Sequence, residues 1–139
     1  MRNNIKHNLT MKNIFLKSSP WMLAVLFITF GSNKFLNFMA VPPPIDSNAQ
    51  AFMTGMFSSY LSSLVGFVEI FSSFMLLFRR TRFLGFLIII PVVLNIILYH
   101  LSTNDVSNPI ILIIGILFGG LCYSQKDAVK KLFKIQSNI

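Results

Sequence analysis

The sequence predicts an all-α integral membrane protein, a four-helix bundle formed by one domain of residues 1–139, with its N-terminus and C-terminus cytoplasmic. The first observation is composition. Hydrophobic residues make up 54% of the chain and charged residues only 12%, whereas about a quarter of the residues in a soluble domain are charged. The second is a series of four apolar runs. The third is the placement of the basic residues, which lie between these runs.

The four apolar runs predict transmembrane helices at about 21–41, 57–78, 83–101 and 109–123. A helix needs about 20 residues to cross about 30 Å of hydrocarbon, so the fourth run is short for a span. Pro109 suits the first position of a helix, and Asn108 is a suitable N-cap before it. The loop between the first two runs has apolar residues at helical spacing, which predicts an interfacial helix at about 48–56.

Basic residues indicate the orientation in the membrane. All but one of the 12 basic residues precede the first run, separate the second from the third, or follow the fourth. The other two loops contain no Lys or Arg, and each holds one aspartate, Asp46 or Asp105. The positive-inside rule then predicts a multi-pass protein of the plasma (inner) membrane with both acidic loops outside. This blockwise arrangement is not that of a nucleic-acid-binding face, so the expected partner is the lipid bilayer.

Ionisable residues inside membrane spans are costly, and they are functional candidates for that reason. Three occur here, Lys34, Glu69 and His100, and Asn33 and Asn95 accompany them. At 1.5 Å per residue, Lys34 lies about 21 Å and Glu69 about 15 Å from the cytoplasmic edge. Asn95 lies at about 18 Å and His100 near about 25 Å. We therefore expect Lys34 and Glu69 to form an ion pair, with Asn95 as a third member of the cluster.

The role of this polar cluster has three interpretations. In the first, the cluster fixes helix packing, as polar groups do in lipid. In the second, it binds a small molecule or a proton. In the third, its groups act separately, and Lys34 alone extends its side chain to the interface. His100 and Asn95 do not share a face of a straight helix. Either the kink at Pro91 brings them together, or His100 faces the outer interface.

Small residues predict where helices pack closely. Gly66 lies on the same helical stripe as Glu69, and Gly115 and Gly119 form a GxxxG pattern that allows close approach of another helix. No phosphate loop, nucleophile elbow or zinc motif is present, so the sequence predicts no metal site and identifies no catalytic residue. With Cys122 as its one cysteine, the chain cannot form an intramolecular disulfide.

The stretches FGSNKFLNFM, VPPP and FVEIFSSFMLLFRRTRFLGFLIIIPVVLNIILYHL resemble the DoxX-like family of small membrane proteins. The matching residues are Gly31, Asn33, Lys34, Glu69, Pro91, Asn95 and His100. The sequence FSSF follows Glu69, where relatives often have a pair of glycines. The resemblance implies a four-helix membrane bundle, with Gly31 at a helix contact.

Some members of that family are associated with quinone-linked sulfur oxidation or with membrane redox complexes. The resemblance therefore implies an accessory subunit of a quinone-linked membrane redox system, with a quinone between Glu69, Asn95 and His100. The alternative is a non-enzymatic membrane scaffold or assembly factor, and a third reading is a small-molecule transporter. The first two imply other membrane subunits or a homo-oligomer as partners. The sequence leaves open whether the protein is an enzyme.

Overall fold

The computed structural model describes residues 2–103 and 108–136, and this part of the chain contains five helices and no strand. The helices are α1 (Arg2–Leu36), α2 (Ser47–Phe57), α3 (Tyr60–Leu77), α4 (Arg82–Ser102) and α5 (Pro109–Gln136). The all-α prediction is therefore confirmed for these residues. Four of the helices are long and apolar enough to cross a membrane, over Met11–Leu36, Tyr60–Leu77, Arg82–Ser102 and Pro109–Lys134.

Two of these helices extend well beyond the apolar runs that predict them. The first run starts near residue 21, but α1 begins at Arg2, and α5 continues to Gln136 instead of ending near residue 123. An apolar run marks only the part of a helix that lies in hydrocarbon, and the Lys, Gln and Ala residues after Tyr123 continue α5 readily beyond it. The helix expected at about 48–56 is α2, which begins after Asp46, whose side chain accepts a hydrogen bond from the Ala49 N–H.

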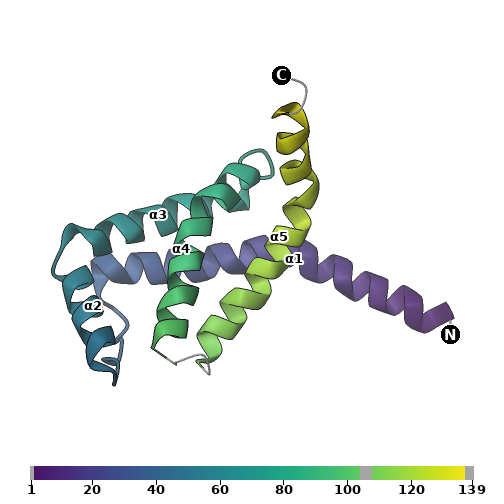
Figure 1. The fold of residues 1–139 in the computed structure, drawn as a ribbon. Coiled ribbons are helices and arrows are strands. Elements are labelled where there is room, and N and C mark those ends of the chain that lie inside the picture. Colours follow the sequence, from purple (N-terminus) through teal and green to yellow (C-terminus); the bar gives the residue numbers. More distant parts are fainter. Residues whose placement is uncertain (1, 104–107, 137–139) are drawn as a thin grey trace.

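The four long helices form a closed ring of contacts, in which α1 packs on α3, α3 on α4, α4 on α5 and α5 on α1. Figure 1 shows that α1 and α3 lie side by side, and that α4 and α5 cross this pair steeply. The short helix α2 lies at the end of the bundle away from both termini and packs on α3 (Figure 1). We call this end the α2 end, and the opposite end, with the α3–α4 turn, the basic end.

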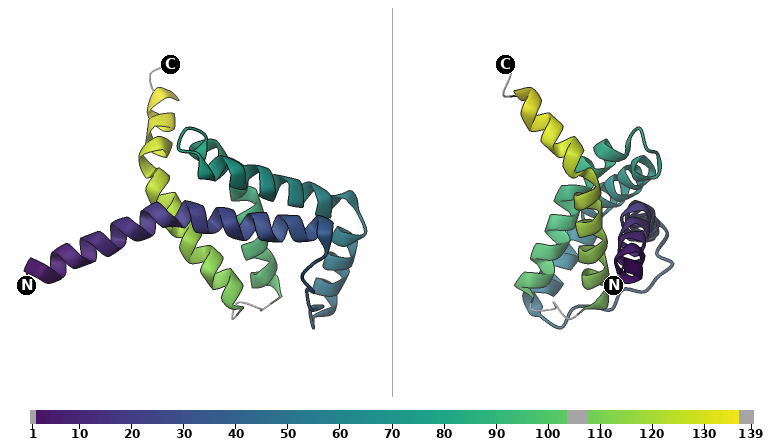
Figure 2. Two further views of the ribbon diagram at one scale, coloured as in Figure 1. Left: turned by 180° about the vertical axis from the view of Figure 1, so that it is seen from behind. Right: turned by 90° about the vertical axis from the view of Figure 1, so that its right-hand side faces the viewer.

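The helix α1 changes direction where α5 crosses it (Figure 2). Pro20 lies inside α1, and a proline removes one backbone hydrogen bond and thereby bends a helix. At the crossing, a Cβ added to Gly120 of α5 would lie 2.7 Å from the Phe15 ring and 3.1 Å from Ser19 Oγ. A side chain at position 120 would therefore force the Phe15 ring to move.

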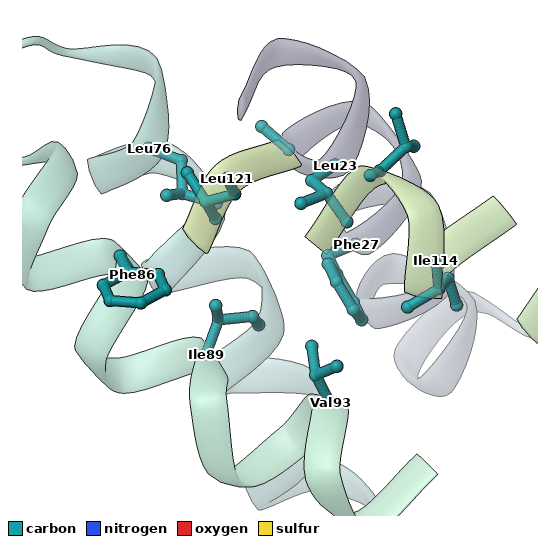
Figure 3. Packing of buried hydrophobic residues seen from close by; sticks show 10 residues of the cluster. Leu23, Phe27, Leu76, Phe86, Ile89, Val93, Ile114 and Leu121 are labelled. Carbon is teal, nitrogen blue, oxygen red and sulfur yellow. The ribbon is translucent and has the colours of Figure 1, made fainter. Parts of the chain in front are cut away.

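An apolar core fills the space between the two helix pairs (Figure 3). Leu23 and Phe27 of α1 are fully buried in it, and so is Leu76 of α3. The contribution of α4 and α5 consists of Phe86, Ile89, Val93, Ile114, Leu117 and Leu121.

Large apolar side chains also cover the outside of the bundle. Val25, Phe67 and Ile116, from three different helices, are 61%, 60% and 63% exposed. A soluble monomer rarely exposes apolar surface on every side. Such a surface is stable in lipid hydrocarbon. The exposed apolar residues and the lengths of the apolar helices therefore both indicate a membrane environment.

Candidate functional site

Lys34, in the last turn of α1, and Glu69, in the middle of α3, form an ion pair. Lys34 Nζ of α1 donates a hydrogen bond to Glu69 Oε2 of α3 over 2.7 Å. The side chains are 15% and 3% exposed, so both are largely removed from the surface. The direct contact expected from their similar depth is therefore present.

Two glycines bring the helices close enough for this pair to form. A Cβ added to Gly31 would lie 2.9 Å from the Gly66 carbonyl oxygen, and one added to Gly66 would lie 3.0 Å from the Gly31 carbonyl oxygen. The charged residues follow these glycines by one helical turn, and each lies against the glycine of the other helix. Gly31 and Gly66 therefore lie at a helix contact, as expected, and the ion pair is built on it.

The ion pair satisfies charges that would otherwise be isolated in an apolar surrounding. Removing one partner of such a pair leaves an uncompensated charge, which is strongly destabilising. Next to it, Ser72 Oγ donates to the Glu69 backbone carbonyl at 3.1 Å, a bond that lies along α3 and leaves the carboxylate to Lys34. The 2.7 Å contact compensates each charge inside the bundle, so the arrangement favours helix packing.

Asn33 lies next to Lys34 in sequence but performs a different task. Its side-chain oxygen accepts from the Met39 N–H at 2.6 Å, and its Nδ2 donates to the Met39 carbonyl at 3.0 Å. Asn37, with φ of 50°, ends α1 in a left-handed conformation, and its N–H donates to the Asn33 carbonyl. Asn33 therefore holds the chain where it leaves α1, and its side chain is already hydrogen-bonded on both atoms.

The structure does not bring Asn95 to the ion pair. Asn95 is exposed on α4, and no hydrogen bond joins it to Lys34 or Glu69 within the described part of the chain. The prediction compared depths along each helix axis. Because α4 crosses the α1–α3 pair steeply instead of running beside it (Figure 1), equal depth does not produce contact.

His100 is also separate from the ion pair and from Asn95. Its ring makes an edge-to-face contact with Tyr99, with 5.3 Å between the ring centres. It lines an apolar groove of about 340 Å³ between α4 and the start of α5, together with Ile97 and Leu112 among others. Asn95 instead faces α2. The two residues thus point to different neighbours, as the helical spacing indicates, and His100 lies against α5.

A second groove, of about 550 Å³, lies between α2 and the last two turns of α4. We call it the α2–α4 groove; it is lined by Asp46, Asn48, Ala49, Phe52, Asn95, Leu98, Tyr99, Ser102 and Thr103. The rings of Phe52 and Tyr99 pack on each other in its wall, with 5.5 Å between the ring centres. The groove therefore combines aromatic and apolar walls with amide, carboxylate and hydroxyl groups.

Polar groups in the α2–α4 groove differ in how far they are already engaged. Ser102 Oγ and Thr103 Oγ1 both donate to the Tyr99 carbonyl, at 2.8 and 3.0 Å. Asp46 caps α2. The side chains of Asn48 and Asn95 are exposed and take part in no hydrogen bond with the described residues. These two amides can therefore donate to or accept from a bound molecule.

Sequence reasoning found Asn95 but missed the rest of this groove. Phe52 has the helical spacing that predicts α2, yet nothing in the spacing says that α2 folds against α4. Tyr99, beside His100 in the sequence, has a residue type that could have indicated this site. An aromatic ring with a polar hydroxyl is typical of a membrane boundary.

Gly115 and Gly119 do not lie in close contact with another helix in the described part of the chain. A Cβ added to either would meet no atom within 4 Å. Instead, the close contacts that the sequence did not single out are made by Gly85 and Gly120. A Cβ on Gly85 would lie 2.7 Å from the Ser72 carbonyl oxygen, so α3 and α4 touch there.

Among the described side chains, no group of three or more His, Cys, Asp or Glu is placed to hold a metal ion.

Comparison of the chain with models of protein families, with curated proteins and with solved structures finds no match. The DoxX-like resemblance stays a prediction that rests on the motif residues of the first three spans.

Proposed function

We propose that this chain is a multi-pass protein of the plasma (inner) membrane, a member of the DoxX-like family, with its termini and the α3–α4 turn in the cytoplasm. The four apolar helices support the membrane assignment. The distribution of Lys and Arg supports the orientation, because basic residues favour the cytoplasmic side. The α2 end of the bundle then faces outward.

We further propose that the protein is an accessory subunit of a membrane redox system and binds a lipid-soluble quinone in the α2–α4 groove. The observation that carries this proposal is the placement of the free amides of Asn48 and Asn95 beside the aromatic pair Phe52 and Tyr99. A quinone head is a flat apolar ring with two carbonyl acceptors. Such a ring fits aromatic walls, and an amide N–H is a suitable donor to a carbonyl oxygen.

This location replaces the one that the family resemblance implies. Glu69 is held by Lys34 at 2.7 Å, and His100 lies against α5, so neither is placed beside Asn95. In the proposal, Asn95 orients the ligand, and Phe52 and Leu98 exclude water from one face of it. The apolar outer surface of the helices receives the isoprenoid tail.

Photolabelling with an azido-quinone in native membranes tests this site. We expect label in α2 and in the last turns of α4, and competition by unlabelled quinone. Asn95→Leu should lower the labelling about tenfold, the effect of losing one or two hydrogen bonds to the ligand. Asn13→Leu is the matched control, since Asn13 is an exposed asparagine of α1 outside the groove. Labelling that survives Asn95→Leu unchanged would contradict the proposal.

A non-enzymatic scaffold or assembly factor is the second candidate function. The closed ion pair at the Gly31–Gly66 contact favours it, because this arrangement stabilises a rigid bundle with an apolar outer surface for other helices. A membrane partner that stays bound in stoichiometric amount after mild detergent extraction, with no quinone in the same complex, would favour the scaffold over the quinone-binding subunit.

A further inference from the structure

The basic end of the bundle has almost no acidic residues to balance its charge. The chain has four acidic residues in all. Asp46 lies at the α2 end, Glu69 is paired with Lys34, and Asp105, which precedes α5 in the sequence, lies outside the described residues. Among the described residues, Asp127 is then the one acidic residue left to balance the basic residues that flank the spans at this end. An anionic partner is therefore the natural complement of this surface.

Two of these basic residues converge on one aromatic ring. Lys12 Nζ of α1 donates to the Tyr123 hydroxyl of α5 at 3.3 Å and lies 4.6 Å from the centre of its ring. Lys126 Nζ lies 4.0 Å from the same ring centre. We call Lys12, Tyr123 and Lys126 the Tyr123 cluster. It joins residues 111 positions apart in the sequence, so the fold itself creates it.

The two ammonium groups repel each other, and a ring offers each only partial compensation. Within the described residues the one ion pair is that of Lys34 and Glu69, so neither Lys12 nor Lys126 has a carboxylate within 4.0 Å, and Asp127 pairs with neither. Both lysines are exposed and Tyr123 is 44% exposed. An anion that approaches from outside can therefore contact both ammonium groups and the phenol hydroxyl.

The position of the Tyr123 cluster along α5, measured across the membrane, indicates the source of that anion. Counting from Pro109, Tyr123 lies about 21 Å and Lys126 about 26 Å along α5 at 1.5 Å per residue. This is close to the far boundary of about 30 Å of hydrocarbon, where phospholipid phosphates begin and where lysine side chains reach outward. Basic sites between membrane helices at this level suit anionic headgroups.

We propose that the Tyr123 cluster binds the phosphate of an anionic phospholipid in the leaflet at the basic end of the bundle. The two ammonium groups and the Tyr123 hydroxyl act as donors to the phosphate oxygens, since phosphate accepts several charge-assisted hydrogen bonds at once. The acyl chains lie along the crossing of α1 and α5. The lipid would thereby bridge the first and last helices of the bundle.

Native mass spectrometry of the full chain, released from micelles with added lipid, tests this proposal. We expect the wild-type protein to keep phosphatidylglycerol in preference to phosphatidylcholine. The double variant Lys12→Gln/Lys126→Gln should lose this preference by about tenfold. The matched control is Lys130→Gln/Lys131→Gln, which removes the same charge from exposed positions of α5 outside the cluster. The control should keep the preference within about twofold.

Three results would overturn the proposal. The first is equal retention of phosphatidylglycerol by the wild type and by Lys12→Gln/Lys126→Gln. The second is an equal loss in the control, which would reduce the effect to general attraction by positive charge. The third is displacement of the lipid by excess inorganic phosphate, which would make free phosphate the ligand. None of these results depends on quinone labelling, so the two proposals are tested separately.

Discussion

At the scale of single residues, the polar side chains inside the spans have different tasks. Lys34 and Glu69 neutralise each other, Asn33 holds the backbone at Met39, and Asn95 is left without a partner among the described residues. Polar groups in hydrocarbon are costly unless they are paired. A polar residue that the fold does not pair is therefore the better candidate for ligand binding, and this favours Asn95 over the ion pair.

The ion pair can be tested by a double-mutant cycle. Lys34→Met or Glu69→Leu alone should lower the free energy of unfolding in micelles by about 3–5 kcal/mol, because each leaves one buried charge without its partner. The double variant should be more stable than either single variant. Lys17→Met, an exposed lysine of the same helix, should have little effect. Effects of the single changes that simply add in the double variant would rule out the pairing.

Asn33 is expected to contribute to stability through the backbone of Met39. Asn33→Leu removes both hydrogen bonds and leaves two backbone groups without partners, so unfolding in micelles should become easier by about 1–3 kcal/mol. Asn13→Leu, on an exposed face of α1, provides the comparison. If the two variants were equally stable, the side chain of Asn33 would not hold the chain reversal in the way described.

At the scale of helices, close contacts depend on glycines at particular crossings. Gly31 and Gly66 join α1 to α3, Gly85 joins α4 to α3, and Gly120 joins α5 to α1. Three of the four contacts in the ring of long helices therefore rest on a residue without a side chain. Small residues at helix contacts are typical of membrane proteins, in which lipid tails are as apolar as the helices.

Alanine substitutions should separate the packed glycines from the open one. Gly31→Ala places a Cβ 2.9 Å from the Gly66 carbonyl oxygen, and backbone atoms cannot move aside cheaply. We expect a loss of about 1–3 kcal/mol in unfolding free energy. Gly119→Ala meets open space and should be neutral or stabilising by up to about 1 kcal/mol, since alanine favours helix. An equal loss for both would show that packing within the chain is not the cause.

At the scale of the whole molecule, the orientation in the membrane decides which side each site faces. Single cysteines are introduced one at a time by Ser47→Cys, Asn104→Cys or Arg80→Cys in a Cys122→Ser background. We expect a membrane-impermeant maleimide to label positions 47 and 104 in intact cells, and position 80 only after lysis. Labelling of position 80 from outside would reverse the orientation and move the Tyr123 cluster to the outer leaflet.

Much of this architecture follows from the sequence. Apolar runs of about 20 residues and blocks of Lys and Arg predict the four long helices, and helical rise places Lys34 and Glu69 at similar depth. Similar depth leads to an ion pair because α1 and α3 lie side by side in the structure. The stripe with Gly66 and Glu69 predicts a close helix contact on α3, and Gly31, which the family resemblance indicates, is the partner on α1.

The remaining features depend on how helices cross, which no local pattern specifies. Asn95 has the right depth but lies on a helix that crosses the pair. Gly115 and Gly119 have the GxxxG spacing but face outward, whereas Gly85 and Gly120 occupy the crossings without any such pattern. The Tyr123 cluster joins α1 to α5 across the length of the chain. Crossing geometry is set by the packing of many side chains together, so these contacts appear only in the folded chain.

The central claim is that the ligand site lies in the α2–α4 groove and that the ion pair is structural. Mass-spectrometric mapping of azido-quinone cross-links tests it most directly, when wild type is compared with the double variant Lys34→Met/Glu69→Leu. We predict cross-links in residues 48–52 and 95–103, at similar yield in both proteins. Cross-links around residues 34 and 69, or their loss from the double variant while it remains folded, would contradict the account.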